Sequence, residues 1–306
     1  NTATPSPFAP PEILTKVNVT GTQALIEACK QCGVKQFILT SSSSVVYSGQ
    51  DILDIDETTD YASQGYNVYT DSKIAQEKLV LAAATKDFAT VALRPSSIYG
   101  PRDALLIPQM YVAAKQGRMK FTLGSGKNLY SFTFVRNASY AHLLAADKLA
   151  NGNEADRSAI SGQAFFINNG KDTPFWQFAS DLCYGAAGYR PTIRIPYAVF
   201  FAIVFFIDIV CKTLGAIGIK VEPPVEFSYD KLAYLTSNRT FKIDKAVKLL
   251  GYKAPYTEEE GLKIGLEYFH KNPPTIPEPK GKGKLMFIIL GLVVAVISVL
   301  FLMLRE

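Results

Sequence analysis

A tyrosine and a lysine four residues apart are the first residues of this chain with the chemistry of a proton-transfer site. Tyr69 and Lys73 stand at the start of a helix predicted at about residues 70–85, and this spacing places both on one helix face. A lysine ammonium beside a phenol lowers the pKa of the phenol, so a tyrosinate can take the proton of an alcohol near neutral pH. An exposed surface pair is the alternative interpretation of the spacing alone.

Two further groups of residues follow strands of the same predicted sheet. Residues 36–40 are predicted as a buried strand, and the serine run Ser41, Ser42, Ser43 and Ser44 comes directly after it. Leu93-Arg94-Pro95 ends a second apolar strand at residues 89–93. The carboxyl ends of parallel strands form the edge where such sheets bind ligands. A serine hydroxyl there can hold a substrate oxygen, and a polar turn is the alternative for the run.

The elements around these residues alternate between strand and helix. Apolar residues recur at helical spacing over 13–32 and 106–116, a further strand is predicted at 163–168, and a helix at 174–183 begins with proline. A polar loop is expected from 48 to 65. This alternation predicts an α/β fold with a doubly wound parallel sheet. We expect residues 1–170 to form a dinucleotide-binding domain that is incomplete at its start, and residues 171–270 a smaller substrate-binding region.

The C-terminal third has the composition of a membrane-associated protein, in a chain of mean hydropathy +0.10. Residues 195–219 are very apolar but include Asp208 and Lys212, which fits either a buried helix or a helix in the bilayer interface. Residues 271–284 form a linker of proline, glycine and lysine, and residues 285–304 carry no charge. We predict a transmembrane helix at 285–304, with the preceding lysines placing the body in the cytosol.

Charge and cysteine content exclude several other classes of protein. The net charge is +5, and the four lysines and one glutamate of residues 271–284 supply +3 of it, so the folded body is nearly neutral and does not resemble a nucleic-acid-binding protein. The 4 cysteines and 2 histidines are too few and too scattered for a disulfide framework, and we expect no metal site.

The chain resembles the extended short-chain dehydrogenases, and among them the 3β-hydroxysteroid dehydrogenase family. Its later stretches are most similar to the members that act in sterol C4-demethylation. The resemblance implies a Rossmann-like fold. The matching segments are Val17-Asn-Val-Thr-Gly-Thr22, Phe37-Ile-Leu-Thr-Ser-Ser-Ser-Ser-Val45, Tyr69-Thr-Asp-Ser-Lys73, Leu93-Arg-Pro-Ser-Ser-Ile-Tyr-Gly-Pro-Arg-Asp103, Gly124-Ser-Gly-Lys-Asn-Leu129, Phe132-Thr-Phe-Val135 and Pro174-Phe-Trp176.

The resemblance also implies roles for individual residues. Tyr69 is the expected general base, Lys73 its pKa partner and a contact to the cofactor ribose, and Ser42 the group that holds the substrate oxygen, with Ser41 and Ser43 as close competitors. Asn18 is expected to support Lys73 through water. The residues expected at the cofactor, besides Tyr69 and Lys73, are Thr2, Ala3, Pro95, Ser96, Ser97 and Ile98.

One part of the family pattern is missing from the sequence. A dinucleotide-binding member begins with a strand, a glycine-rich turn and a helix that holds the pyrophosphate. Gly124-Ser-Gly126 lacks this context. We therefore expect an N-terminal truncation, with the chain beginning near the end of the fourth strand of the family and with Thr2 and Ala3 over the cofactor. NAD is the cofactor that the resemblance implies, and NADP stays an alternative.

The expected activity is oxidation of the 3β-hydroxyl of a 4α-carboxysterol to a ketone, with decarboxylation, at the endoplasmic reticulum membrane. The expected partners are the sterol and the membrane, together with a second copy of the chain or a sterol-demethylation complex. One alternative is a 3β-hydroxy-Δ5-steroid dehydrogenase/isomerase. Another is a non-catalytic, membrane-tethered sterol-binding or scaffold protein. A sugar-nucleotide epimerase shares the expected fold and the Tyr–Lys pair, but it is usually soluble.

Overall fold

The structure is a computed structural model that describes residues 1–216, 218, 227–275 and 291. The chain divides into two compact units. Unit 1 contains Asn1–Ile107, Leu129–Thr173 and Asn238–Asn272, and unit 2 includes Pro108–Asn128 and Pro174–Ser237. Each unit is therefore built from segments that are distant in sequence, whereas the predicted dinucleotide-binding domain (1–170) and substrate-binding region (171–270) are each one continuous segment.

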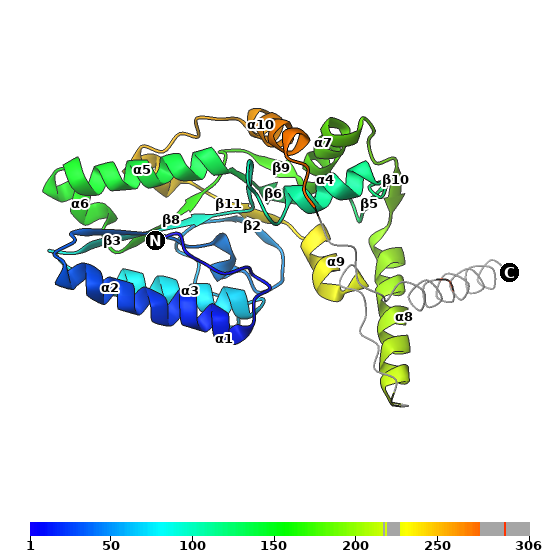
Figure 1. Cartoon of the computed structure of the whole chain (residues 1–306), viewed down its shortest axis with the longest axis horizontal. Helices are drawn as coiled ribbons and strands as arrows, with labels where there is room; N and C mark the ends of the chain where they lie inside the picture. The colour runs from blue at the N-terminus through cyan, green and yellow to red at the C-terminus, as the bar shows by residue number, and fades with distance from the viewer. Residues whose placement is uncertain (217, 219–226, 276–290, 292–306) are drawn as a thin grey trace. The chain divides into compact units, whose positions relative to one another are not determined.

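A parallel sheet of three strands forms the centre of unit 1, in the order β1-β3-β8. The middle strand β3 is buried along its whole length, because helices cover both faces of the sheet. Figure 1 shows α1, α2 and α3 on one face and α5 with α6 on the other. The predicted α/β fold with helices on both faces of a parallel sheet is confirmed. The strands are β1 (Gln36–Thr40), β3 (Ala89–Pro95) and β8 (Gln163–Ile167).

Two of the helical segments beside this sheet lie where the sequence predicted helices. The predicted helix at 13–32 is one continuous helical segment with a π-helical turn inside it, and the predicted helix at 70–85 begins and ends two to three residues earlier. The bounds are α1 (Pro11–Leu14), the π-helical turn η1 (Thr15–Thr20), α2 (Gly21–Gln31), α3 (Val68–Ala82), α5 (Val135–Asn151), α6 (Glu154–Ile160) and the π-helical turn η4 (Ala246–Leu250).

A second sheet in unit 1 joins distant segments in the order β2-β11-β6-β9. The prediction of a loop at 48–65 is partly wrong, because this segment contains strand β2. This strand pairs in parallel with β11, which lies almost 190 residues later. Neither strand alternates strongly enough to be recognised without its partner. The elements are β2 (Ile52–Ile55), β6 (Leu129–Ser131), β9 (Asp172–Pro174), β11 (Arg239–Phe241), the short pair β4 (Ile98–Tyr99) and β7 (Thr133–Phe134), and α10 (Glu258–Lys271).

Unit 2 is mainly helical and contains one long apolar helix, α8 (Tyr197–Ala216). Its 20 residues have a mean hydropathy of 2.2, and by length and composition it is the one helix among the described residues that is long and apolar enough to cross a membrane. Only 22% of its most apolar window is buried. The other elements are α4 (Ile107–Lys115), β5 (Phe121–Leu123), α7 (Phe175–Ala187), β10 (Ile193–Ile195) and α9 (Tyr229–Thr236).

The faces of α8 differ in burial, and the exposed face is apolar apart from its last turns, where Lys212 pairs with Asp208. Phe200, Val204, Ile207 and Cys211 recur every three to four residues and form its buried stripe. Apolar side chains also lie on the exposed face, among them Phe201 and Phe205. The helix predicted at 195–219 is therefore present, with one face buried in unit 2 and an apolar face exposed. The membrane helix predicted at 285–304 lies outside the described residues except for Gly291, as does the linker beyond residue 275.

Candidate active site

The hydroxyls of Ser42 and Tyr69 meet at the carboxyl end of β1. The backbone N–H of Ser41 donates to Leu93 O of β3 (2.7 Å), which continues the sheet just past β1. Ser42 then caps a 3-10 turn, η2 (Ser43–Val46), and its Oγ accepts the backbone N–H of Ser44 at 3.2 Å. This cap fixes the direction of the Ser42 side chain, which hydrogen-bonds the phenol of Tyr69.

The serines of the run differ in the groups they contact. Ser41 donates its hydroxyl to Glu77 Oε2 inside the protein, and Ser43 is buried at 7% exposure. Ser44 donates to Ser42 Oγ at 2.9 Å. Within the run, Ser42 is thus the residue whose hydroxyl reaches Tyr69. Its role in holding the substrate oxygen stays a prediction.

Tyr69 is positioned by the first turn of α3. Asn67 caps this helix, because its side chain accepts the N–H of Thr70 at 2.9 Å. Burial raises the pKa of the Tyr69 phenol, and hydrogen bonds to Ser42 and Thr4 act in the opposite direction. A buried phenol that already has two hydroxyl neighbours can exchange a proton with an alcohol placed among them.

Lys73 lies one turn further along α3 and is almost fully buried at 1% exposure. Its Nζ donates to Thr40 O (2.7 Å) at the end of β1 and to Gln76 Oε1 (2.6 Å). Burial lowers its pKa from 10.5 to about 8, and the nearby Glu77 opposes this shift. The ammonium is thus directed at Thr40 and Gln76, and its expected effect on the pKa of Tyr69 stays a prediction.

Asn18 lies in the π-helical turn η1, fully buried against α3. Its Nδ2 donates to Ser72 Oγ (3.0 Å), and Ser72 Oγ donates to Tyr69 O (2.7 Å). Asn18 is thus connected to the backbone of Tyr69 rather than directly to Lys73. Its Oδ1 is buried without a hydrogen-bond partner among the residues described, which suits the water expected between Asn18 and Lys73.

The expected cofactor contacts lie at the ends of β3 and β1. Pro95 ends β3, and the N–H of Ser96 donates to Thr133 Oγ1 (3.1 Å). Ser97 has φ +43°, a left-handed conformation that costs energy for a residue with a side chain and that is typical of functional sites. Ile98 is 40% exposed.

The first residues of the chain run beside β1. The N-terminal amine of Asn1 donates to Ile38 O (2.6 Å), and the N–H of Thr40 donates to Asn1 O (2.9 Å). Thr2 and Ala3 follow and are exposed. They therefore lie near the same end of the sheet as the serine run.

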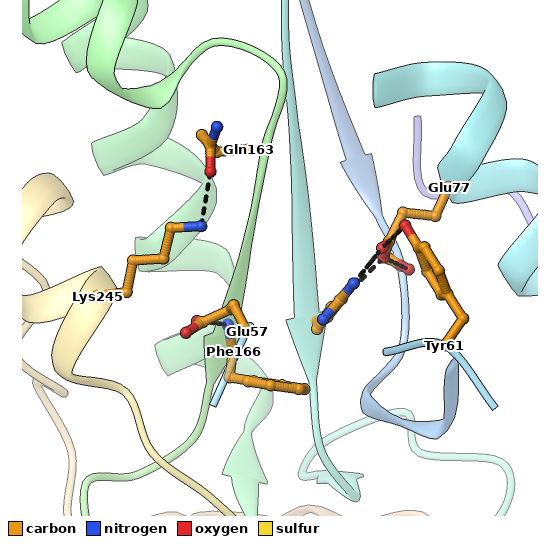
Figure 2. Close-up of polar contacts among 8 residues, drawn as sticks. Glu57, Tyr61, Glu77, Gln163, Phe166 and Lys245 are labelled. Atoms are coloured by element: carbon orange, nitrogen blue, oxygen red, sulfur yellow. Dashed lines mark hydrogen bonds and ion pairs between the residues drawn. The ribbon is translucent and has the colours of Figure 1, made fainter. Parts of the chain in front are cut away.

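A buried network next to Lys73 was not foreseen from the sequence. Arg94 of β3 donates from Nη2 to Glu77 Oε1 (2.6 Å) and from Nε to both carboxylate oxygens, and both side chains are at most 4% exposed. Figure 2 shows the hydroxyl of Tyr61 directed at the Glu77 carboxylate, which it reaches at 2.8 Å. Burial and Glu77 raise the pKa of Tyr61 to about 12.

This network fixes the catalytic segments to one another. Glu77 follows Lys73 by four residues on the same helix, and it binds Ser41 of the serine run and Arg94 of the neighbouring strand. Two features of the sequence could have indicated this network. One is the four-residue spacing that continues from Tyr69 through Lys73 to Glu77, and the other is the charged Arg94 within an apolar strand. Thr4, the other missed residue, had no such signal, because its contact to Tyr69 arises only from the folded path of the chain.

Comparison with known proteins shows the fold and the family of the chain. UDP-glucuronic acid 4-epimerase from Bacillus cereus, solved in complex with NAD, superimposes with a TM-score of 0.61 at 18% identity, over 86% of this chain and 71% of that chain. The fold is thus the Rossmann-like α/β fold of this group of enzymes. The 3-beta hydroxysteroid dehydrogenase/isomerase family matches residues 7–199. The chain belongs to this family, which confirms the resemblance.

Two relatives show how much of the chain is shared. Sterol-4-alpha-carboxylate 3-dehydrogenase, decarboxylating, from Mus musculus is 37% identical over 271 residues, which are 88% of this chain and 73% of the mouse protein. The 3beta-hydroxysteroid-dehydrogenase/decarboxylase isoform 1 of Arabidopsis thaliana is 40% identical over 255 residues, 83% of this chain and 57% of the plant protein.

Proposed function

We propose that this protein oxidises the 3β-hydroxyl of a 4α-carboxysterol to a 3-ketone with a nicotinamide dinucleotide, after which the carboxylate is lost as carbon dioxide. The observation that carries the proposal is the hydrogen bond between Ser42 and Tyr69 at the carboxyl end of the parallel sheet. The names of the mouse and Arabidopsis relatives supply the substrate class.

The side chains divide the work of alcohol oxidation between them. Ser42 holds the 3-oxygen of the substrate, and Tyr69 takes the proton of that hydroxyl as the C3–H bond breaks. When bound, the nicotinamide dinucleotide supplies the acceptor for the hydride from C3. Tyr69 is the catalytic base in this scheme. Burial raises the pKa of its phenol, and the hydrogen bond to Ser42 opposes part of that rise.

The residues present fit the nicotinamide half of such a cofactor. Pro95, Ser96, Ser97 and Ile98 leave the sheet at the edge where ligands bind, and the left-handed backbone at Ser97 is typical of a functional turn. Thr2 and Ala3 lie at the neighbouring strand end. We propose these residues as its contacts, with Lys73 near the ribose and Asn18 supporting Lys73 through water, and NAD rather than NADP as the cofactor.

Decarboxylation needs no further group from the protein. Oxidation at C3 converts the 4α-carboxysterol into a β-keto acid, whose ketone accepts the electron pair of the breaking C–C bond as an enolate. Carbon dioxide leaves as that bond breaks, and the enolate then takes a proton. The order of the two steps follows from this chemistry, because the ketone must exist before the carboxylate can depart.

We further propose that the protein acts at the endoplasmic reticulum membrane, anchored by residues 285–304 with its body in the cytosol. The apolar exposed face of α8 supports this location, since a sterol substrate partitions into bilayers and α8 is apolar enough to lie in their interface. A second copy of the chain and a sterol-demethylation complex remain predicted partners.

A direct assay tests the proposed activity. The full-length protein is incubated in membranes with NAD and a 4α-carboxysterol labelled in the carboxyl group, and dinucleotide reduction and released carbon dioxide are measured together. We expect one of each per turnover. A protein that reduces the dinucleotide with a Δ5-3β-hydroxysteroid and moves the double bond, but leaves the acid unchanged, would instead be the dehydrogenase/isomerase that the family name also covers.

A further inference from the structure

Unit 2 contains a two-stranded ribbon whose two faces differ in chemistry. Strands β5 and β10 pair in parallel, with Phe121 opposite Ile193 and Thr122 opposite Arg194. Because successive side chains of a strand point to opposite faces, Phe121 and Ile193 share one face. Lys120 precedes Thr122 by two residues and so shares the other face with Arg194. The two apolar residues are 39% and 56% exposed, and both basic residues are exposed.

The basic face of this ribbon lacks an acidic partner in the described part of the chain. Arg194 donates from Nε to Gly124 O (2.9 Å), which holds its guanidinium at the end of β5, and neither Arg194 nor Lys120 forms an ion pair there. In the same unit, Asp181 and Asp208 each pair with another cation. The ribbon therefore carries positive charge that these carboxylates do not balance. Residues 108–128 add positive charge alone, from Lys115, Arg118, Lys120 and Lys127.

Helix α8 continues directly from this ribbon, as Figure 1 shows. Pro196 alone separates β10 from α8, and Tyr197 and Val199 at the start of the helix are 50% and 43% exposed. Exposed apolar residues thus run from the ribbon into the helix that is proposed to lie in the bilayer interface. A nucleic acid would neutralise the positive charge but leave these apolar residues in water. An anionic bilayer offers both phosphates and acyl chains.

We propose that the β5–β10 ribbon is a docking surface for anionic phospholipids, with Lys120 and Arg194 at the lipid phosphates and Phe121 and Ile193 toward the acyl chains. The inference rests on the proposed membrane location and names the lipid class that holds unit 2 there. The cytosolic leaflet, which a cytosolic body faces, is the leaflet that carries anionic lipids. Each lysine or arginine close to such a surface strengthens binding about fivefold, whereas a neutral bilayer attracts only the apolar face.

The test measures contact between the ribbon and vesicles of defined charge. Phe121→Trp is made in the full-length protein, which is reconstituted in phosphatidylcholine vesicles with brominated acyl chains and increasing fractions of phosphatidylserine. The parent protein, whose one tryptophan is Trp176, gives the background. We expect quenching of the new tryptophan to rise with the fraction of phosphatidylserine. Lys120→Gln with Arg194→Gln is expected to weaken the contact about 25-fold, and Lys120→Arg with Arg194→Lys, which keeps both charges, to retain it.

Lys35→Gln with Lys86→Gln is the matched control, because it removes the same charge from two exposed lysines of unit 1 and should leave the quenching unchanged. Equal quenching in neutral and anionic vesicles, or quenching that survives the loss of both ribbon charges, overturns the proposal.

Phe205→Trp in α8 reports the membrane location separately. If this tryptophan is quenched and the one at position 121 never is, the location stands and the ribbon is not a lipid-docking surface. If neither is quenched in any vesicle, the proposed location fails together with the ribbon. Sterol oxidation is assayed independently of both tryptophans, so a failure of the proposed activity is told apart from either result.

Discussion

The hydroxyl of Ser42, directly after a buried parallel strand, hydrogen-bonds the phenol of Tyr69 in the first turn of α3. The two residues are 27 positions apart in sequence, and the fold joins them because β1 ends at the edge where α3 begins. Lys73 reinforces this junction by donating from α3 to Thr40 at the end of the same strand.

The contacts of the serine run predict different effects for neighbouring substitutions. Ser42→Ala removes the hydroxyl that reaches Tyr69 and is expected to lower kcat with the 4α-carboxysterol about 100-fold, within the range of proton-transfer contributions. Ser43→Ala, the matched control, is expected to change kcat by less than about threefold. Steady-state kinetics and melting temperatures of both variants check this, and equal losses would mean that the register of the site is wrong.

The low pKa of Lys73 predicts a pH-dependent stability. Burial lowers its pKa from 10.5 to about 8, so the folded state disfavours the charged amine. This destabilisation is complete below pH 8 and absent above pH 10.5. The free energy of unfolding of the wild type should therefore rise with pH across this window, relative to Lys73→Met, by on the order of 3 kcal/mol. Denaturant titrations at pH 7.5 and 10, followed by the fluorescence of Trp176, measure the difference. A difference that does not change with pH would contradict the assignment.

The buried pair of Glu77 and Arg94 predicts a strongly coupled double mutant. Glu77→Gln leaves the Arg94 charge buried without its carboxylate and is expected to cost about 3–5 kcal/mol of stability. Glu77→Leu combined with Arg94→Met removes both charges and should cost less than the sum of the two single changes. Denaturant unfolding of the wild type, Glu77→Leu, Arg94→Met and the double mutant gives the coupling, and additive losses would show that the pair is not the link between α3 and β3.

The exposed face of α8 predicts a contact with lipid. Phe205 is 44% exposed, and a tryptophan at this position is expected to be quenched by lipids brominated in their acyl chains when the full-length protein is in vesicles. Val247→Trp, at an exposed residue of η4, serves as the control and should keep its fluorescence. Equal quenching of both tryptophans, or none of either, would place α8 away from the bilayer.

The sequence predicted the parts of the fold whose signal is local. Buried strands such as β1 and β3 are continuous apolar runs, and α3 has a capping asparagine and the Tyr69–Lys73 spacing within a single segment. Strand β2 was missed because its pairing with β11 depends on a segment far away in the chain. The same reason hid Thr4, because only the folded chain brings it to Tyr69.

The sequence also could not predict which groups contact the charged side chains inside the site. Lys73 was expected to act on the Tyr69 phenol, but which acceptor an ammonium reaches depends on fractions of an ångström, and the structure directs it to Thr40 and Gln76. The choice of Ser42 within the serine run stays a prediction, and the 3-10 turn that begins after Ser42 is the feature of the fold that favours it.

The central claim is that Tyr69 takes the proton of the sterol hydroxyl, and Tyr69→Phe tests it most directly. This change removes the phenolic oxygen and keeps the ring, so the melting temperature should stay within a few degrees of the wild type. With a 4α-carboxysterol and NAD, we predict that dinucleotide reduction falls about 100- to 10,000-fold and that carbon dioxide release falls by the same factor. Near-normal turnover by Tyr69→Phe, or carbon dioxide released without dinucleotide reduction, would contradict the account.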